Sequence, residues 1–287
     1  MIQSVDCAHC ISLGELFCYY YSSSLKQELR EAVDCIFGDL IAKLILSQDV
    51  YREKLLENKM AELLLLLDPA WHFQTISTGM IQLGKHPIMP DWVFKIAARK
   101  TLPHMHPMAH VLRVPMSVFL KEIVQKNALV SIEIPDKVLI PLLSDELIAE
   151  LGEEEYKDAY VVMAEKKECF SEKETISHIK QQSFLVQRGL AEELCILVKN
   201  GFIDLRWDNL LFSRKNGKLV LIDTEPLFGE LTVTGVDREK FPRNIEMKKT
   251  MQQSVALGFK TFIHTSEMHG LSIFSEVAKK YAKAGCV

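Results

Sequence analysis

Three side chains with oxygen donors interrupt an apolar stretch in the last third of the sequence. Asp204 and Asn209 lie within 202–212, and Asp223 follows the apolar run 219–222. Carboxylate and amide oxygens suit Mg²⁺, which takes one or two carboxylates and fills its other positions with phosphate oxygens and water. Phosphoryl transfer needs such a metal on the phosphates and a carboxylate that orients the attacking hydroxyl. Asp and Asn also end strands and turns, but here the whole string supplies the groups for phosphoryl transfer.

The elements around these residues form one continuous unit. A helix over 181–199 is predicted to end at Asn200-Gly201, and short strands are predicted over 202–204 and 210–212. Asn216-Gly217 predicts a hairpin turn, because this pair tolerates positive φ, and the returning strand covers 219–222. Upstream, Ser171 followed three residues later by Glu174 predicts a capping box that opens another helix.

This order of residues resembles the catalytic region of the protein-kinase superfamily, whose loop reads His-Arg-Asp-Leu-x-x-x-Asn and whose metal motif is Asp-Phe-Gly. The resemblance implies that Asp204 is the catalytic base, that Asn209 holds a second magnesium and that Asp223 is the principal metal ligand. Arg206 takes the place of a lysine that often contacts the transferred phosphate, and Phe202 replaces the histidine.

The metal motif itself reads Ile-Asp-Thr-Glu over 222–225. It is similar to the Ile-Asp-x-Glu of the aminoglycoside phosphotransferase and choline kinase branch. The resemblance therefore points to an atypical, small-molecule-like member of the superfamily.

Two upstream segments extend the resemblance. The segment 92–96 resembles the third-strand Val-Ala-Ile-Lys, which implies that Lys95 holds the nucleotide phosphates. The segment 160–165 resembles the fifth strand leading into the hinge between the lobes, where backbone groups receive adenine. In that strand Glu165 marks the hinge and Met163 is expected to guard the back pocket.

Other features depart from the family pattern. A helix glutamate should pair with the strand lysine, but Arg113 stands near the expected position, and Glu122 in the predicted helix 116–127 is the nearest acidic candidate. Single glycines within 77–79 and 83–85 replace the glycine-rich loop. After Asp223 only two further helices are predicted, over 255–264 and 271–282, so the helical lobe is truncated.

Composition limits the function classes. The 287 residues include 48% hydrophobic and 25% charged residues, enough for one large domain or two lobes, and the net charge of −4 gives no global attraction to nucleic acid.

The odd, scattered set of seven cysteines favours free thiols in a reducing compartment. Cys7 and Cys10 have the spacing of half a zinc site, but no second pair follows. The apolar segment 7–25 contains Glu15 and lacks a preceding basic residue, so no membrane span is predicted.

The sequence therefore predicts an α+β, two-lobed, protein-kinase-like fold. An N-terminal helical extension covers 1–70, with helices over 24–46 and 50–67. An N-lobe with a small mixed sheet and one helix covers 71–168, with strands predicted over 72–80, 91–96, 129–134 and 160–164. Turns are predicted at 84–87 and 89–90, between the first two of these strands. A truncated helical C-lobe covers 169–287.

The predicted function is transfer of the terminal phosphoryl group of ATP, with Mg²⁺, to a hydroxyl of a protein or small-molecule acceptor. Two alternatives stay open: a pseudokinase that serves as a nucleotide-binding or scaffolding module, and a kinase-fold enzyme that transfers AMP or another group. A cytoplasmic location is expected. Divergent kinase-like proteins are common among bacterial effectors delivered into host cells, which leaves such a delivery open.

Overall fold

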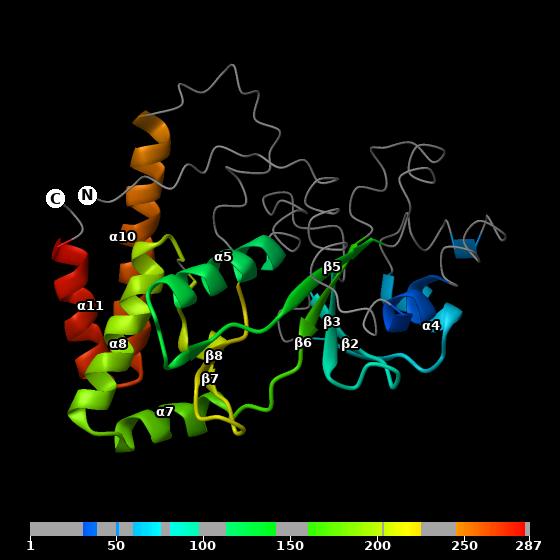
Figure 1. The fold of residues 1–287 in the computed structure, drawn as a ribbon, viewed down its shortest axis with the longest axis horizontal. Helices are drawn as coiled ribbons and strands as arrows, with labels where there is room; N and C mark the ends of the chain where they lie inside the picture. The colour runs from blue at the N-terminus through cyan, green and yellow to red at the C-terminus, as the bar shows by residue number, and fades with distance from the viewer. Residues whose placement is uncertain are drawn as a thin grey trace. The chain divides into compact units, whose positions relative to one another are not determined.

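The computed structural model describes residues 31–38, 50–51, 60–75, 81–97, 113–141, 160–202, 204–224 and 245–284, and these form a mixed α+β structure (Figure 1). The chain divides into two compact units. Unit 1 comprises Met1–Val114 and Lys137–Lys166, and unit 2 comprises Pro115–Asp136 and Lys167–Val287. The segment 115–136, which the sequence assigned to the first lobe, thus clusters with unit 2.

Unit 1 is built on a five-stranded antiparallel sheet with the order β1-β2-β3-β6-β5. Its strands are β1 (His72–Thr75), β2 (Ile81–Lys85), β3 (Trp92–Ala97), β5 (Lys137–Pro141) and β6 (Tyr160–Glu165). In chain order, β3 is the third strand of this sheet and β6 is the fifth. Residues 161–164 of β6 are all buried, so both faces of this strand are covered, which favours its β-branched residues.

One face of the unit 1 sheet packs against helices that precede it. Helix α4 (Met60–Leu67) and a helical segment over 31–38 share a hydrophobic core with the sheet. Trp71 lies at the centre of this core, stacked on Phe73 and edge-on to Phe94, with ring centroids 5.4 and 4.8 Å apart. Within the described residues, the N-terminal helices are therefore part of the core that supports the sheet.

Unit 2 consists of helices packed around a short three-stranded sheet, β4-β8-β7. The helices are α5 (Arg113–Lys126), which begins at the boundary with unit 1, α7 (Glu172–Gln181), α8 (Phe184–Lys199), α10 (Ile245–Met268) and α11 (Ser272–Ala284). The strands are β4 (Ile132–Glu133), β7 (Leu210–Phe212) and β8 (Leu219–Leu221), and the 3-10 turn η2 covers Trp207–Asn209. Helices α8, α10 and α11 lie side by side (Figure 1). The turn and the hairpin that follow α8 are thus held against a helical core.

Several local predictions in unit 2 are confirmed. Ser171 and Glu174 form the capping box at the start of α7. Helix α8 ends at Lys199, and Gly201 adopts φ 95° directly after it. The β7–β8 hairpin turns with φ 68° at Gly217, as glycine allows.

Other predictions of elements were wrong. No strand forms at Phe202 or Asp204, which lead from α8 into η2. Residues 129–134 supply only the two-residue strand β4, and the adjacent strand β5 was missed. The Gly84-Lys85 pair, interpreted as a turn, lies in β2. A Cβ atom built on Gly84 would lie 2.6 Å from the Phe73 ring, so this glycine allows an aromatic ring to pack on the strand.

Among the described residues, no helix combines the length and apolar character needed to cross a membrane. The described cysteines Cys35, Cys169 and Cys195 are free thiols. Cys7 and Cys10, with their half zinc-site spacing, and the glycine at 79 lie outside the described residues.

Candidate functional site

The candidate site is centred on the loop that joins α8 to the β7–β8 hairpin. The Nδ2 atom of Asn209 donates to Oδ2 of Asp204 over 2.8 Å. Backbone hydrogen bonds from Arg206 N to Asp204 O (3.1 Å) and from Asn209 N to Arg206 O (3.0 Å) close the loop on itself. Asp204 and Asn209, five positions apart in the sequence, therefore meet as a side-chain pair, and the amide oxygen of Asn209 takes no part in this bond.

Arg206 contacts the other oxygen of Asp204. Its Nε atom lies 2.9 Å from Asp204 Oδ1 and 3.5 Å from Asp208 Oδ1. Asp204 is mostly buried, with 20% of its side chain exposed, whereas Arg206 is 46% exposed. The guanidinium group thus shields a half-enclosed carboxylate and extends into solvent, where its terminal nitrogens can meet an anionic group.

Asp223 comes to the same loop through the hairpin. Residues Leu210 and Leu221 are paired across β7 and β8, and the Ile222 amide donates to the Asn209 carbonyl oxygen over 2.9 Å. Asp223 is the next residue, half-buried, and its Oδ1 atom is a buried oxygen that accepts no hydrogen bond from the part of the chain that the structure describes. The register of the hairpin therefore sets Asp223 one residue beyond the point where Asn209 is fixed.

A buried tryptophan anchors this loop, and the sequence reasoning missed its role. Trp207 is the first residue of η2 and is 1% exposed, between the exposed residues Arg206 and Asp208. Its indole Nε1 donates to Ser266 Oγ in α10 over 3.2 Å. The only sequence signal was a large aromatic residue amid charged neighbours, which does not identify its partner 59 residues away.

Lys95 belongs to unit 1, on β3. It is partly buried and is paired with Val162 of β6, whereas Phe94 is paired with Met163. Directly opposed residues of antiparallel strands share a face, and successive residues alternate. Lys95 and Val162 therefore share one face of the sheet, and Met163 lies on the other face.

This register changes the interpretation of Met163. The side chain is fully buried in the core formed with Phe94, Ile96 and the N-terminal helices. On β6, Ala164 alternates to the same face as Lys95. The expected pocket-guarding role of Met163 beside Lys95 does not fit this geometry, and Ala164 is the β6 residue near the hinge position on that face.

The remaining sequence candidates belong to other elements than the loop. Glu165 is the last residue of β6 and is paired with Trp92, in unit 1. Glu122 is exposed on α5, on the side of the helix opposite to the buried Leu120 and Ile123. The structure therefore does not bring Glu122 into the core next to a lysine, as a buried ion pair would require.

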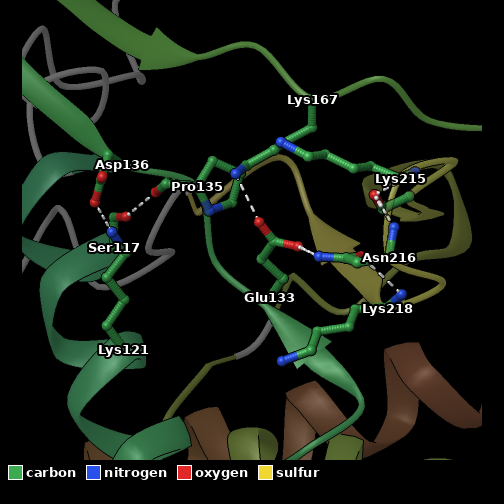
Figure 2. Close-up of polar contacts among 10 residues, drawn as sticks. Ser117, Lys121, Glu133, Pro135, Asp136, Lys167, Lys215, Asn216 and Lys218 are labelled. Atoms are coloured by element: carbon green, nitrogen blue, oxygen red, sulfur yellow. Dashed lines mark hydrogen bonds and ion pairs between the residues drawn. The ribbon is translucent and has the colours of Figure 1, made fainter.

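A second polar cluster in unit 2 surrounds Glu133 of β4 (Figure 2). Lys167 Nζ lies 2.6 Å from Glu133 Oε1, and Asn216 Nδ2 donates to Oε2 over 2.7 Å. The pair is largely enclosed, with 18% of the Lys167 side chain and 21% of the Glu133 side chain exposed. Lys215 and Lys218 belong to the same hairpin turn as Asn216 (Figure 2). The cluster ties β4 and the hairpin tip to the first residue of unit 2 after β6.

The charge on Glu133 follows from these contacts. Burial is the largest single influence and acts to raise the pKa of the carboxyl. The hydrogen bond from Asn216 and the ion pair with Lys167, aided by the charge of Lys218, outweigh burial, so the net pKa is below its usual value. Glu133 is therefore ionised at neutral pH and is occupied by its own partners, which suits a structural role.

The oxygen donors of the loop fit a magnesium ion better than a soft metal. Among the described residues, no group of three or more His, Cys, Asp or Glu side chains is arranged to hold a metal on its own. Mg²⁺ does not need such a cage, because one or two protein oxygens plus phosphate oxygens and water complete its octahedron. The carboxylate of Asp223 and the amide oxygen of Asn209 are donors of this type.

Comparison of the chain with models of known protein families and with curated proteins gives no match. Function is therefore inferred from the geometry of the loop site.

Proposed function

We propose that this chain is a divergent kinase-like phosphotransferase, which transfers the terminal phosphoryl group of ATP to a hydroxyl acceptor with the help of Mg²⁺. The observation that carries the proposal is the Asp204–Asn209 side-chain pair, fixed by the hairpin next to Asp223. A carboxylate for the hydroxyl and two oxygen donors for the metal thus lie on one loop and at the end of the hairpin that follows it, and phosphoryl transfer depends chiefly on such positioning.

Each residue of the loop has a role in this proposal. Asp204 accepts a hydrogen bond from the acceptor hydroxyl and orients its oxygen for attack. Arg206, half-exposed beside Asp204, supplies positive charge toward the transferred group. Asp223 and Asn209 hold Mg²⁺, which neutralises charge that develops on the phosphate oxygens. The hydrogen bond from Asn209 Nδ2 to Asp204 aims the amide oxygen of Asn209 toward the metal position.

We also propose a protein-kinase-like fold for the two units, on the order of their elements. Lys95 lies on the third strand of the unit 1 sheet and Glu165 ends the fifth, as the resemblance implies. The division between the units falls at Lys166 and Lys167, directly after the expected hinge residue Glu165. In unit 2, helix α8, the Asp204 loop, the hairpin and Asp223 follow in the order of the kinase catalytic region. Lys95 is proposed to bind the nucleotide phosphates.

A second candidate is a pseudokinase that binds nucleotide without efficient transfer. It is favoured by Phe202, which is fully buried at the position of the family's histidine. Retention of the oxygen donors at Asn209 and Asp223 favours the active enzyme over this alternative.

The test is a calorimetric titration of ATP with and without Mg²⁺, on the wild type, on Asp223→Asn and on Asp208→Asn. We expect magnesium-dependent binding that Asp223→Asn weakens by at least about tenfold, because one charged metal ligand is lost. Asp208 is the matched control, since it is a 53% exposed aspartate of the same loop and has no role in the proposed metal site. Its variant should bind Mg-ATP like the wild type.

Two outcomes would reject parts of the proposal. No binding of ATP by the wild type at millimolar concentration would reject a nucleotide-dependent enzyme. Equal weakening by Asp208→Asn and Asp223→Asn would show a general charge effect and reject the assigned metal site. Incubation with ATP labelled separately in the terminal phosphate and in adenine would then distinguish phosphoryl transfer from AMP transfer by the label found in the product.

A further inference from the structure

Trp207 occupies an unusual place in the loop that carries Asp204 and Asn209. It is the first residue of η2, and its backbone is flanked by the exposed side chains of Arg206 and Asp208. Its own side chain is almost fully buried in the helical core of unit 2. The loop is thus inserted into the core at one point, two residues before Asn209.

The contacts of Trp207 lie on the two C-terminal helices. The indole Nε1 donates to Ser266 Oγ of α10 over 3.2 Å, and Ser266 is itself fully buried. The ring is edge-on to Phe274 of α11, with centroids 5.1 Å apart, and tilted against Phe262 of α10 at 6.1 Å. A buried indole N–H costs free energy when it lacks an acceptor, so the position of Ser266 selects one orientation of the ring.

We propose that Trp207 is a positioning residue for the site and that α10, through Ser266, sets the geometry of Asp204 and Asn209. The inference rests on the proposed function for its consequence, but the coupling itself is a property of the unliganded protein. Loss of the Trp207–Ser266 hydrogen bond loosens the turn, and with it the two short backbone bonds that hold Asp204 and Asn209 together. The C-terminal helices thereby control metal-dependent nucleotide binding without contacting the ligand.

The experiment measures amide hydrogen exchange of the nucleotide-free protein, residue by residue. In Ser266→Ala, we expect the amides of Arg206 and Asn209 to exchange at least about tenfold faster, because a buried donor is left without its acceptor. The control amides are those of Thr175 and Ser213, which donate to Ser171 O and Lys218 O elsewhere in unit 2. Their exchange should stay close to that of the wild type.

Three further variants separate positioning from general destabilisation. Trp207→Phe keeps an aromatic ring but lacks the N–H, so it should also accelerate exchange at Arg206 and Asn209. Adding Ser266→Ala to Trp207→Phe should then change little, because the donor is already absent. Ser266→Thr keeps the hydroxyl acceptor and is expected to restore slow exchange at the two amides.

The outcomes of the exchange experiment can be told apart from the outcomes of the ATP titration that tests the proposed function. Uniform acceleration at all four amides in Ser266→Ala, or no acceleration at Arg206 and Asn209, would overturn the inference. If the exchange pattern is as expected, the affinity for Mg-ATP should fall in Ser266→Ala and return in Ser266→Thr. An exchange pattern as expected in a wild type that binds no ATP would reject the proposed function and leave the coupling of α10 to the loop intact.

Discussion

Asn209 and Asp204 are joined side chain to side chain, with Nδ2 of Asn209 2.8 Å from Oδ2 of Asp204. The bond joins an amide to a charged carboxylate in a partly buried place, where such bonds are stronger than neutral ones. It also gives the amide group one orientation. Asn209 therefore has two separable effects, on the stability of the loop and on the metal.

Asn209→Ala is expected to destabilise the protein by about 1.5–3 kcal/mol, the usual cost of a lost hydrogen bond to a charged group. It should also weaken Mg-dependent ATP binding by about tenfold, because one metal ligand and the orientation of Asp204 are lost together. Urea unfolding and calorimetry measure the two effects. Asn127→Ala is the control, since Asn127 caps the end of α5 through a 2.8 Å bond to Ile123 O and should alter stability only. An unchanged affinity in Asn209→Ala would argue against its assignment as a ligand.

Lys95 gives a prediction for unit 1. It shares a face of the central strands with Val162, and its ammonium is proposed to bind phosphate oxygens. Lys95→Met should lower ATP affinity by about tenfold while leaving the fold intact, because methionine fills a similar volume without the charge. Lys85→Met changes the net charge by the same amount from an exposed position on the neighbouring strand β2. Calorimetry on both variants decides whether the effect belongs to Lys95, and an equal loss in both would contradict the specific role.

Gly84 gives a prediction about the core of unit 1. A methyl group at this position would meet the Phe73 ring at 2.6 Å, so Gly84→Ala should destabilise the protein by about 1–3 kcal/mol, the usual cost of overpacking. Gly189 lies within α8 with nothing within 4 Å of its added Cβ, and Gly189→Ala should stabilise by about 0.5–1 kcal/mol through helix propensity. Thermal unfolding of both variants checks the opposite signs. A stabilising Gly84→Ala would show that the Phe73 ring moves aside freely.

The same glycine shows where prediction from the sequence stops. The capping box at Ser171 and the turn at Gly217 were predictable because each depends on residues a few positions apart. Gly84 was interpreted as a turn because its reason for being glycine is an aromatic ring on another strand. The face of Met163 likewise depends on the register between β3 and β6, which are about 70 residues apart in the chain.

At the candidate site, too, contacts between nearby residues could be predicted and contacts between distant residues could not. The chemistry of Asp204, Asn209 and Asp223 could be predicted from residue types and spacing, because one loop and one hairpin bring them together. The anchoring of Trp207 by Ser266 could not, because it depends on a contact across 59 residues. Glu133 and Lys167 were missed for a related reason, since neither belongs to a motif and their pairing is set by β4 joining the sheet beside β8.

Glu133 leads to a prediction about acid stability. Its pKa in the folded protein is below the value of 4.5 that an ordinary glutamate has. A carboxyl with a depressed pKa contributes stability that is complete above the unfolded value and is lost as the pH falls through the folded value. Glu133→Gln removes the ion pair to Lys167, and at pH 7 we expect it to destabilise the protein by about 1 kcal/mol, since the exposed 18% and 21% of the two side chains let solvent screen the pair.

The difference in stability between wild type and Glu133→Gln should therefore be constant from pH 7 down to about pH 5 and shrink below that. Urea unfolding at a series of pH values gives this difference directly. Glu174, whose pKa is also lowered by hydrogen bonds from Ser171 and the charge of Arg214, is present in both proteins, so its contribution cancels. Glu276→Gln, at an exposed position of α11, is the control and should show no such trend. A difference that grows as the pH falls would mean that Glu133 is destabilised by burial more than it is stabilised by Lys167 and Asn216.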